Sequence, residues 1–143
     1  MKFEVRKLNS TDYDSILTKW WKNWRWTSPP KDFLPENGEG GFIVYEEDIP
    51  VCAGYIYITN SKVGWCDWII SNFEYKDKIK REQALIYLIS VLTNTLKLSG
   101  CKYSYALLKS KSLTQHYEKN GYIESGTYNT EMIKILCYFG LFG

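Results

Sequence analysis

The sequence predicts an α/β fold of the α+β type, with a central mixed β-sheet flanked by helices. Closely spaced strand patterns over residues 41–71 predict an antiparallel meander. The period of the apolar residues then changes, and residues 80–98 form the clearest amphipathic helix. A strand pattern follows over 101–108, and such a strand–helix–strand unit favours a parallel pair in the same sheet. Residues 1–143 are expected to form a single domain.

The first elements are a strand and an aromatic helix. Apolar and polar residues alternate over 2–8, which predicts a strand. Apolar residues at helical spacing then follow possible helix caps at 9–11. Ser28-Pro29-Pro30 stops any helix, and the proline and glycine residues of 31–41 predict a loop.

The meander and the second half of the chain follow. Its strands are predicted at 41–45, 51–59 and 63–71, separated by short polar turns. Ser99-Gly100 ends the long helix, and a short helix around Tyr117 comes after the strand at 101–108. Two final strands are predicted at 122–125 and 130–138.

The composition excludes several classes of protein. A net charge of only +2 argues against nucleic acid as the default partner. No signal peptide or membrane-spanning segment is apparent, so we expect no membrane association. No C-x-x-C pair accompanies the single histidine, which argues against a metal site. Four scattered cysteines predict reduced core residues of a cytoplasmic protein: Cys52, Cys66, Cys101 and Cys137.

The short helix at residues 112–121 carries the first candidate catalytic group. Ser112 and Gln115 are spaced as a capping box, and Gly121 stands where a left-handed residue ends a helix. Tyr117 is therefore aimed inward, where a phenol either packs or transfers a proton. The neighbouring His116 is expected on the surface or half-buried, without a role.

Asp67 and the turn before the long helix are two further candidates. Asp67 interrupts an otherwise apolar strand, so it is either a base near a cleft or an edge residue facing solvent or a lysine. The turn combines a helix N-terminus with cations and could bind a phosphate. It could equally be a solvated basic turn, since it lacks glycines. Its cations are Lys76, Lys78, Lys80 and Arg81.

Tryptophans are concentrated in the first helix and just after it. They cannot all share one helix face, so part of this aromatic surface is expected to stay exposed and mark a substrate or partner site. Core packing is the alternative for each of them singly. The residues concerned are Trp20, Trp21, Trp24 and Trp26.

Two segments resemble the GNAT superfamily of acyl-CoA-dependent N-acyltransferases. Pro50-Val51-Cys52-Ala53-Gly54 is similar to its P-V-x-x-G strand, and residues 110–122 to its N-x-x-A-x-x-x-Y-x-K-x-G-F segment. In the second segment Ser110 replaces the asparagine, Leu113 the alanine and Tyr122 the phenylalanine. The order of elements resembles the family over almost the whole chain.

The resemblance implies a GNAT-like fold and an N-acetyltransferase that uses acetyl-CoA. An amine on a small molecule, peptide or protein would attack the thioester directly. Tyr117 would protonate the departing thiolate, and Asp67 is our candidate base. The tryptophan region would border the acceptor pocket. The residues implied in cofactor binding are Ile69, Ile70, Ser71, Lys76, Lys78, Ile79, Lys80, Arg81 and Ser110.

One departure from the family pattern keeps a second hypothesis open. The family's pyrophosphate loop reads R/Q-x-x-G-x-G/A, and residues 76–81 carry neither glycine. The alternative is a catalytically inactive GNAT-like module that binds a protein through its tryptophan-rich surface. Either a monomer or a homodimer is compatible with the sequence.

Overall fold

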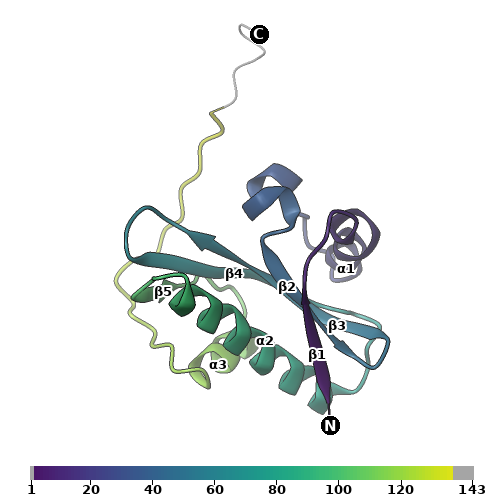
Figure 1. The fold of residues 1–143 in the computed structure, drawn as a ribbon. Coiled ribbons are helices and arrows are strands. Elements are labelled where there is room, and N and C mark those ends of the chain that lie inside the picture. The colour runs from purple at the N-terminus through teal and green to yellow at the C-terminus, as the bar shows by residue number, and fades with distance from the viewer. Residues whose placement is uncertain (1, 137–143) are drawn as a thin grey trace, which may run out of the picture.

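The computed structural model describes residues 2–136, which fold around one twisted sheet (Figure 1). Within that range the sheet has five strands in the order β1-β2-β3-β4-β5. The strands are β1 (Phe3–Lys7), β2 (Gly41–Glu46), β3 (Ile49–Ile58), β4 (Val63–Ser71) and β5 (Tyr103–Tyr105). The first four are joined antiparallel, and β5 pairs parallel with β4. The predicted meander, parallel pair and mixed sheet are confirmed.

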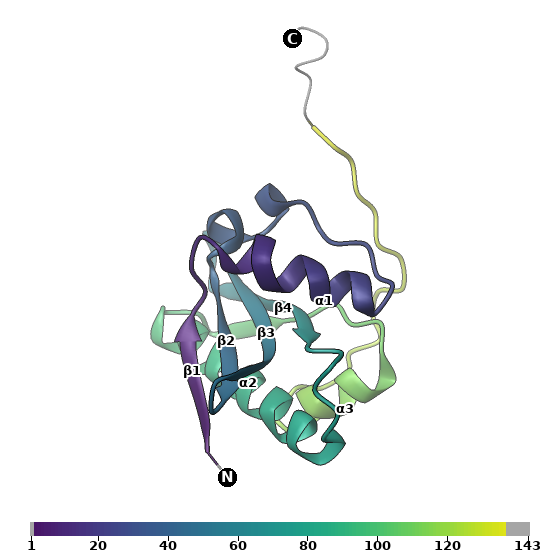
Figure 2. The same ribbon diagram turned by 90° about the vertical axis from the view of Figure 1, so that its right-hand side faces the viewer.

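The helices cover both faces of the sheet. Figures 1 and 2 show α1 on one face and both α2 and α3 on the other. Their bounds are α1 (Thr18–Asn23), α2 (Lys78–Leu98) and α3 (Lys111–Glu118). A π-helical turn over Tyr13–Leu17 leads into α1, and 3₁₀ turns over Lys31–Phe33 and Pro35–Gly38 interrupt the predicted loop.

Each face has its own apolar core. On the α2 side, Leu88 and Leu92 pack with Val44 and Cys66 of the sheet. On the α1 side, a second cluster contains Leu17, Trp20, Trp21, Ile43, Ala53 and Tyr55. Residues from alternate positions of the same strands therefore supply both cores, as the period of a strand requires.

Most predicted elements shift by a few residues at their ends, and in two of them a side-chain bond sets the new limit. The carboxylate of Asp77 accepts the Lys80 N–H, so α2 begins at Lys78 rather than at residue 80. The strand predicted at 101–108 is paired only over Tyr103–Tyr105. Beyond it the Leu107 N–H donates to the carboxylate of Asp67 instead of to a neighbouring strand.

The two predicted C-terminal strands are wrong as far as residue 136. Tyr122 is still anchored, since its hydroxyl lies 2.6 Å from both Thr93 Oγ1 and Ser104 Oγ. The chain after it leaves the sheet as a tail, here defined as residues 123–136 (Figure 1). A strand needs a neighbour for its backbone hydrogen bonds, and the tail has none among the described residues. Residues 137 and 138 of the second predicted strand lie outside the described residues.

The cysteines agree with the sequence where they can be followed. Cys52 and Cys66 are buried free thiols, and Cys101 is a half-buried one. Burial raises the pKa of Cys66 to about 12. Cys137 lies outside the described residues. Within residues 2–136, no helix has the length and apolar composition that a bilayer crossing requires.

Candidate active site

β4 contains a bulge next to Asp67. Trp68 and Ile69 together face the single residue Gly54 of β3, and the pairing is regular again on either side. Trp68 has a φ of +58°, a left-handed conformation that costs a bulky residue ~1–3 kcal/mol. A Cβ at Gly54 would collide with Ile69 Cδ1, so this glycine makes room for the bulge. The strained backbone is thus built into the middle of the sheet.

Several contacts hold Trp68 in this strained conformation. Its indole Nε1 donates to the hydroxyl of Tyr57 at 2.9 Å. That hydroxyl in turn donates to the carbonyl oxygen of Phe33, also at 2.9 Å. The ring of Phe33 meets the Trp68 ring edge-on, with centroids 5.7 Å apart. The bulge is therefore fixed by neighbours on the α1 face of the sheet.

Beyond Trp65, none of the described residues forms a strand along one edge of β4. β5 pairs with β4 only from Val63 to Trp65, and the two segments then separate. Side chains take up the edge instead: Tyr117 donates to the carbonyl oxygen of Cys66, and Trp24 Nε1 donates to that of Ser71 at 2.8 Å. In the second half of β4, carbonyl groups therefore accept hydrogen bonds from side chains rather than from a neighbouring strand.

Asp67 lies where β4 and β5 separate. Its carboxylate accepts the N–H of Leu107, with the nearer oxygen at 3.2 Å. Burial raises the pKa of Asp67 to about 7; the N–H groups of Leu107 and Trp68 oppose this rise, and the nearby Glu131 adds to it. Asp67 is half-buried and does not pair with a lysine, and its pKa lies where a base can work near neutral pH.

Tyr117 approaches β4 from the opposite face. Its side chain is 1% exposed, and its hydroxyl donates to the Cys66 carbonyl at 2.6 Å. Burial, followed by the influence of Cys66, raises the pKa of Tyr117 far above its usual value. Cys66 packs in the core on the α2 side, so Asp67, the next residue, points to the α1 side. Asp67 and the Tyr117 hydroxyl thus lie at two consecutive residues of β4, Asp67 and Cys66, on opposite faces of the sheet.

The helix that carries Tyr117 begins at a different cap than the sequence suggests. The N-cap is Ser110, whose hydroxyl accepts the Leu113 N–H at 3.1 Å, and Ser112 lies inside the helix. The predicted Ser112 capping box is therefore wrong. Gly121 does have the expected left-handed φ, +90°. His116 is buried rather than exposed, because it lies on the same inward face as Tyr117.

The predicted acyl-binding residues divide between the two cores. Ile69 packs against the α2 side and Ile70 against the α1 side, and both side chains are buried. The carbonyl of Ser71 is the acceptor for Trp24. Ile69 and Ile70 could therefore meet a ligand at the free edge of β4 only through backbone groups.

The predicted tryptophan surface is only partly at the surface. Trp20 and Trp21 are 4% and 2% exposed and belong to the core beneath α1. Trp26 is 52% exposed and stacks on Trp24, with ring centroids 5.9 Å apart. Trp24 also meets Phe73 edge-on at 4.8 Å, close to the end of β4. The structure therefore brings Trp24 and Trp26, but not the other pair, to the rim of the site.

Most of the cations in the turn before α2 already interact with other groups of the protein. Lys80 Nζ pairs with Glu46 at 2.8 Å, which raises the pKa of Lys80 and lowers that of Glu46. The guanidinium of Arg81 donates to the Tyr75 carbonyl at 2.8 Å. Lys76 Nζ lies 4.5 Å from the centre of the Phe73 ring. These cations are thus neither a free phosphate cluster nor a simply solvated turn.

The remaining residues of this turn face outward. Ile79 is 70% exposed, and Lys78 is exposed beside it. The first N–H groups of any α-helix lack acceptors within the helix. Here the carboxylate of Asp77 takes the Lys80 N–H. An anion bound at this end would have to share the helix terminus with a carboxylate.

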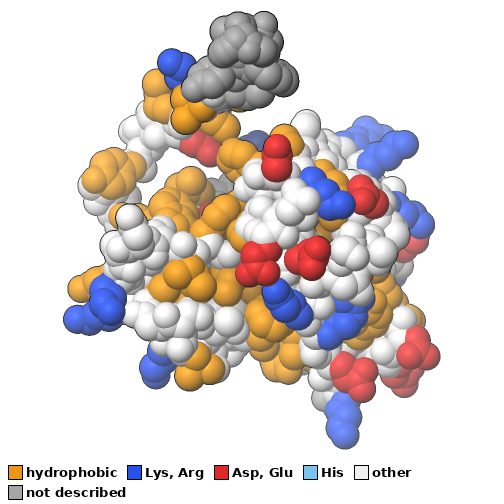
Figure 3. Space-filling view, turned by 45° about the horizontal axis from the view of Figure 1, so that its top comes forward, with side chains coloured by type: hydrophobic (Ala, Val, Ile, Leu, Met, Phe, Trp, Pro, Cys, Tyr) orange, Lys and Arg blue, Asp and Glu red, His pale blue; other side chains and the backbone are white. Residues whose placement is uncertain are grey.

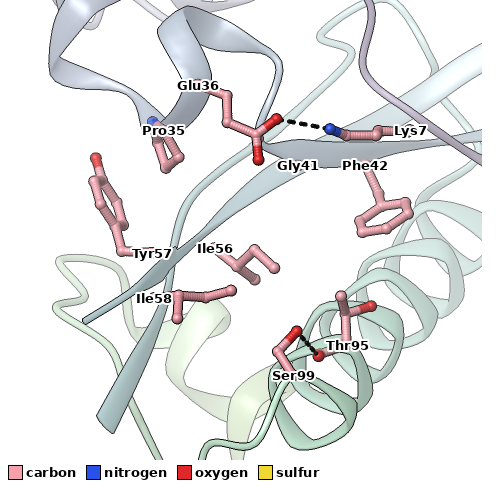
Figure 4. Close-up of a pocket in the computed structure, with 11 residues that line it drawn as sticks. Lys7, Pro35, Glu36, Gly41, Phe42, Ile56, Tyr57, Ile58, Thr95 and Ser99 are labelled. Carbon is pink, nitrogen blue, oxygen red and sulfur yellow. Dashed lines mark hydrogen bonds and ion pairs between the residues drawn. The ribbon is translucent and has the colours of Figure 1, made fainter. Parts of the chain in front are cut away.

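One hollow of the described residues lies away from the candidate site (Figure 4). It has a volume of about 470 Å³ and opens at the C-terminal end of α2, near Thr95 and Ser99. Phe42, Ile56 and Ile58 form its apolar floor, and the Lys7–Glu36 ion pair lies beside it. The N-terminal turn of α2 and the bulge are not part of its lining, so it is no extension of the candidate site.

Some features of the site could not be read from the sequence. Leu107 contributes only its backbone N–H, which any residue would supply. The bulge leaves a weak signal, Gly54 in the facing strand, which permits close approach. Tyr57 and Phe33 support Trp68 from separate elements, and nothing in their spacing predicts this contact.

Comparison with known proteins places the fold. No protein-family model matches the sequence, and no curated protein matches it. Solved structures do match over nearly the whole chain. The glucosamine-6-phosphate N-acetyltransferase from Arabidopsis thaliana is 15% identical, with a TM-score of 0.60, and the match covers 96% of this chain and 100% of that one.

Two further structures agree. The ribosomal-protein-S18-alanine N-acetyltransferase from Escherichia coli matches with 14% identity and a TM-score of 0.62, over 87% of this chain and 79% of that one. The aminoglycoside N-acetyltransferase AAC(6')-Iy, solved with CoA, matches with 15% identity and a TM-score of 0.59, over 95% and 96% of the two chains. Together with the mixed sheet, its bulged fourth strand and the helices on both faces, these likenesses show that the chain has the fold of the GNAT-type N-acetyltransferases.

Proposed function

We propose that this protein transfers an acetyl group from acetyl-CoA to an amine by direct attack. The observation that carries the proposal is the position of Asp67 in β4 and of the Tyr117 hydroxyl beside it. The Tyr117 hydroxyl donates to Cys66, the residue before Asp67 in β4. The two side chains therefore lie at consecutive residues, on opposite faces of the strand. A thioester lying along the free edge of β4 would have a base on its acceptor side and an acid on the side of its sulfur.

The proposed reaction needs two proton transfers. The amine nitrogen attacks the thioester carbonyl carbon, the carbon–sulfur bond breaks, and CoA leaves as its thiolate. Asp67 accepts the proton that the attacking nitrogen loses, and Tyr117 donates a proton to the sulfur. Solvent then restores both side chains. Because the pKa of Asp67 is about 7, a substantial fraction is ionised at neutral pH and available as the base.

The bulge supports the proposal for a second reason. Regular strands turn their N–H groups into the ladder, whereas a bulge leaves a residue of the strand unpaired. The backbone N–H of Ile69, next to Trp68, would stabilise the negative charge that develops on the thioester oxygen during attack. The strain at Trp68 is then a cost of holding this donor in place.

CoA binding would use the first turn of α2. The pyrophosphate of CoA would meet the helix N-terminus and the exposed Lys78, while Lys80 lies in the same turn and Lys76 just before it. Ile79 would contribute a backbone N–H group, whereas that of Arg81 already donates to the Asp77 carbonyl, and Ser110 caps the helix that carries the acid. Trp24 and Trp26 lie at the rim where an acceptor would enter.

The second candidate function is a GNAT-like module without acetyl transfer that binds a protein partner. The observation in its favour is that polar groups in the turn before α2 are already bonded within the protein. Asp77 caps the helix terminus, and Lys80 is paired to Glu46. Its exposed tryptophan, Trp26, would then belong to a partner surface.

A thermal-shift titration with acetyl-CoA separates the two candidates. Ligand that binds only the folded state at a hundredfold excess over Kd adds ~2.7 kcal/mol of stability. The transferase proposal predicts a rise in unfolding temperature with acetyl-CoA, and release of free thiol once an amine is added. An unchanged unfolding temperature at millimolar acetyl-CoA would favour the binding module.

A further inference from the structure

An exposed aromatic surface lies beside Asp67 on the α1 face of the sheet. We define this aromatic patch as Phe33, Tyr57, Trp65, Trp68 and Tyr105. Phe33 is 44% exposed and Tyr105 50% exposed, and the other members are half-buried. Figure 3 shows hydrophobic side chains gathered on the body of the molecule beside the tail. A contiguous exposed apolar surface of this kind marks a binding site more often than a polar surface does.

The patch is held together by its own contacts. Trp65 and Tyr105 meet edge-on across β4 and β5, with centroids 4.8 Å apart, and Phe33 and Trp68 meet in the same way at 5.7 Å. Tyr57 lies between these pairs, opposite Trp65 on the neighbouring strand. Its hydroxyl is used inside the patch, as acceptor from Trp68 and donor to Phe33. The patch therefore presents mainly ring faces and edges.

The charge next to the patch is negative. Asp67 lies two residues from Trp65 on the same side of β4, and the pKa of Tyr57 is raised chiefly by burial and further by the charge of Asp67. The charged group that acts on Asp67 is a second carboxylate, Glu131 of the tail. Ring faces attract cations, and two carboxylates reinforce that preference. A cation with an apolar body matches both properties.

We infer that the acceptor is an amine carried on an aromatic or flat apolar body, which the aromatic patch binds while its ammonium group lies at Asp67. This inference rests on the proposed function, since it names the acceptor of the same site. The ammonium loses one proton to solvent before attack, and the second goes to Asp67 in the reaction above. A polyhydroxylated amine would leave many hydroxyl groups against ring faces without hydrogen-bond partners.

The test is calorimetric binding to the full-length protein at pH 8, without acetyl-CoA. The probes are 2-phenylethylamine, 2-phenylethanol, which keeps the ring but lacks the charge, and ethanolamine, which keeps the charge but lacks the ring. We expect 2-phenylethylamine to bind about tenfold more tightly than either of the others. Equal affinity for the three probes would overturn the inference.

Variants locate the binding. Tyr105→Leu, at an exposed edge of the patch, should weaken 2-phenylethylamine about three- to tenfold, and Trp65→Leu should weaken it further. The matched control is Tyr87→Leu, an exposed tyrosine of α2 that stacks on Phe3 and lies outside the patch. It should bind as the unchanged protein does. A loss in the control equal to that in Tyr105→Leu would contradict the assignment, as would no loss in either.

Two further outcomes separate this inference from its alternatives. If 2-phenylethylamine binds only after Ile133→Asp in the tail, the patch is a docking site for the tail, and the inference fails. If the amine binds but is not acetylated at saturating acetyl-CoA, the transferase proposal fails while the amine site stands. If ethanolamine and 2-phenylethylamine are acetylated with equal kcat/KM, the transferase stands and the aromatic preference is refuted.

Discussion

The middle of β4 and the first turn of α2 follow one another along the chain, yet their charged groups differ in how far they are paired. At β4 a half-buried carboxylate has no cation beside it, a tryptophan has a left-handed backbone, and one strand edge has no strand partner within residues 2–136. At α2 the helix terminus is capped by Asp77, and Lys80 is paired to Glu46. The region of the proposed chemistry is strained and its carboxylate lacks a cation, whereas the polar groups of the region proposed to hold the nucleotide are already paired.

This difference indicates which region would control the rate of acetyl transfer and which would control the affinity for CoA. Costly features persist only where the surrounding structure enforces them, and they concentrate at functional sites. A turn whose charges are already paired must give up protein contacts before it can bind a pyrophosphate. We therefore expect substitutions at β4 to change the rate of transfer and substitutions at the α2 turn to change CoA affinity.

The largest effect is expected from Asp67→Asn. Removing the base should lower kcat/KM about 10²- to 10⁴-fold, measured by thiol release from acetyl-CoA. In the unchanged protein kcat/KM should rise with pH through about 7, as Asp67 ionises. The variant should lose this rise. A profile that still rises through pH 7 in Asp67→Asn would assign the base to another group.

The same variant should change stability with the opposite pH dependence. The folded-state pKa of Asp67, about 7, lies above its ordinary value of 3.8, so ionisation of the folded protein costs stability. This cost is absent below pH ~4 and complete above pH ~7. Asn keeps the bond to Leu107 but cannot ionise. Its unfolding temperature should exceed that of the unchanged protein at pH 8 and match it at pH 4; the reverse order would contradict the burial of this charge.

The next effect in size is expected from Tyr117→Phe. It removes the proposed acid, and kcat should fall about 10- to 100-fold while the KM for acetyl-CoA changes little. The Cys66 carbonyl also loses its donor in a buried site, which should cost about 1–2 kcal/mol in denaturant unfolding. Loss of stability with unchanged kcat would leave Tyr117 a purely structural residue.

A smaller and opposite effect is expected from Asp77→Asn. Asparagine caps a helix as well as aspartate does, so the unfolding temperature should hardly change. Removal of the negative charge at the helix terminus should strengthen CoA binding about two- to fivefold, measured by calorimetry at low salt. Weaker CoA binding in this variant would place the pyrophosphate somewhere other than the first turn of α2.

The smallest effect is expected from Glu46→Gln. It releases Lys80 from its ion pair without altering the helix. CoA affinity should rise about twofold or less, and added salt should abolish the gain because exposed charges are screened. A gain that persists at high salt would mean that Glu46 acts by something other than its charge.

The sequence predicts the parts of the fold that depend on local patterns. The meander, the long helix and the parallel pair follow from apolar periodicity and turn residues between 41 and 108. The inward aim of Tyr117 follows from helical spacing and the glycine that ends its helix. Such features need only residues close together in the chain, which is why a sequence carries them.

The features that the sequence does not predict depend on distant contacts. The partner of Asp67 is a backbone N–H 40 residues away, and the left-handed Trp68 is held by Tyr57 and Phe33 from other elements. The cap at Ser110, rather than Ser112, depends on where the chain leaves β5. The tail has apolar residues typical of strands, but strand pattern alone does not supply a neighbouring strand.

The most direct test of acetyl transfer at β4 is the release of CoA thiol from acetyl-CoA with 2-phenylethylamine as acceptor, followed between pH 6 and pH 9. The unchanged protein should release thiol at a rate that climbs as pH passes about 7, and Asp67→Asn should be slower by at least about a hundredfold throughout. Thiol release by Asp67→Asn at the rate of the unchanged protein, across that whole range, would contradict the central claim.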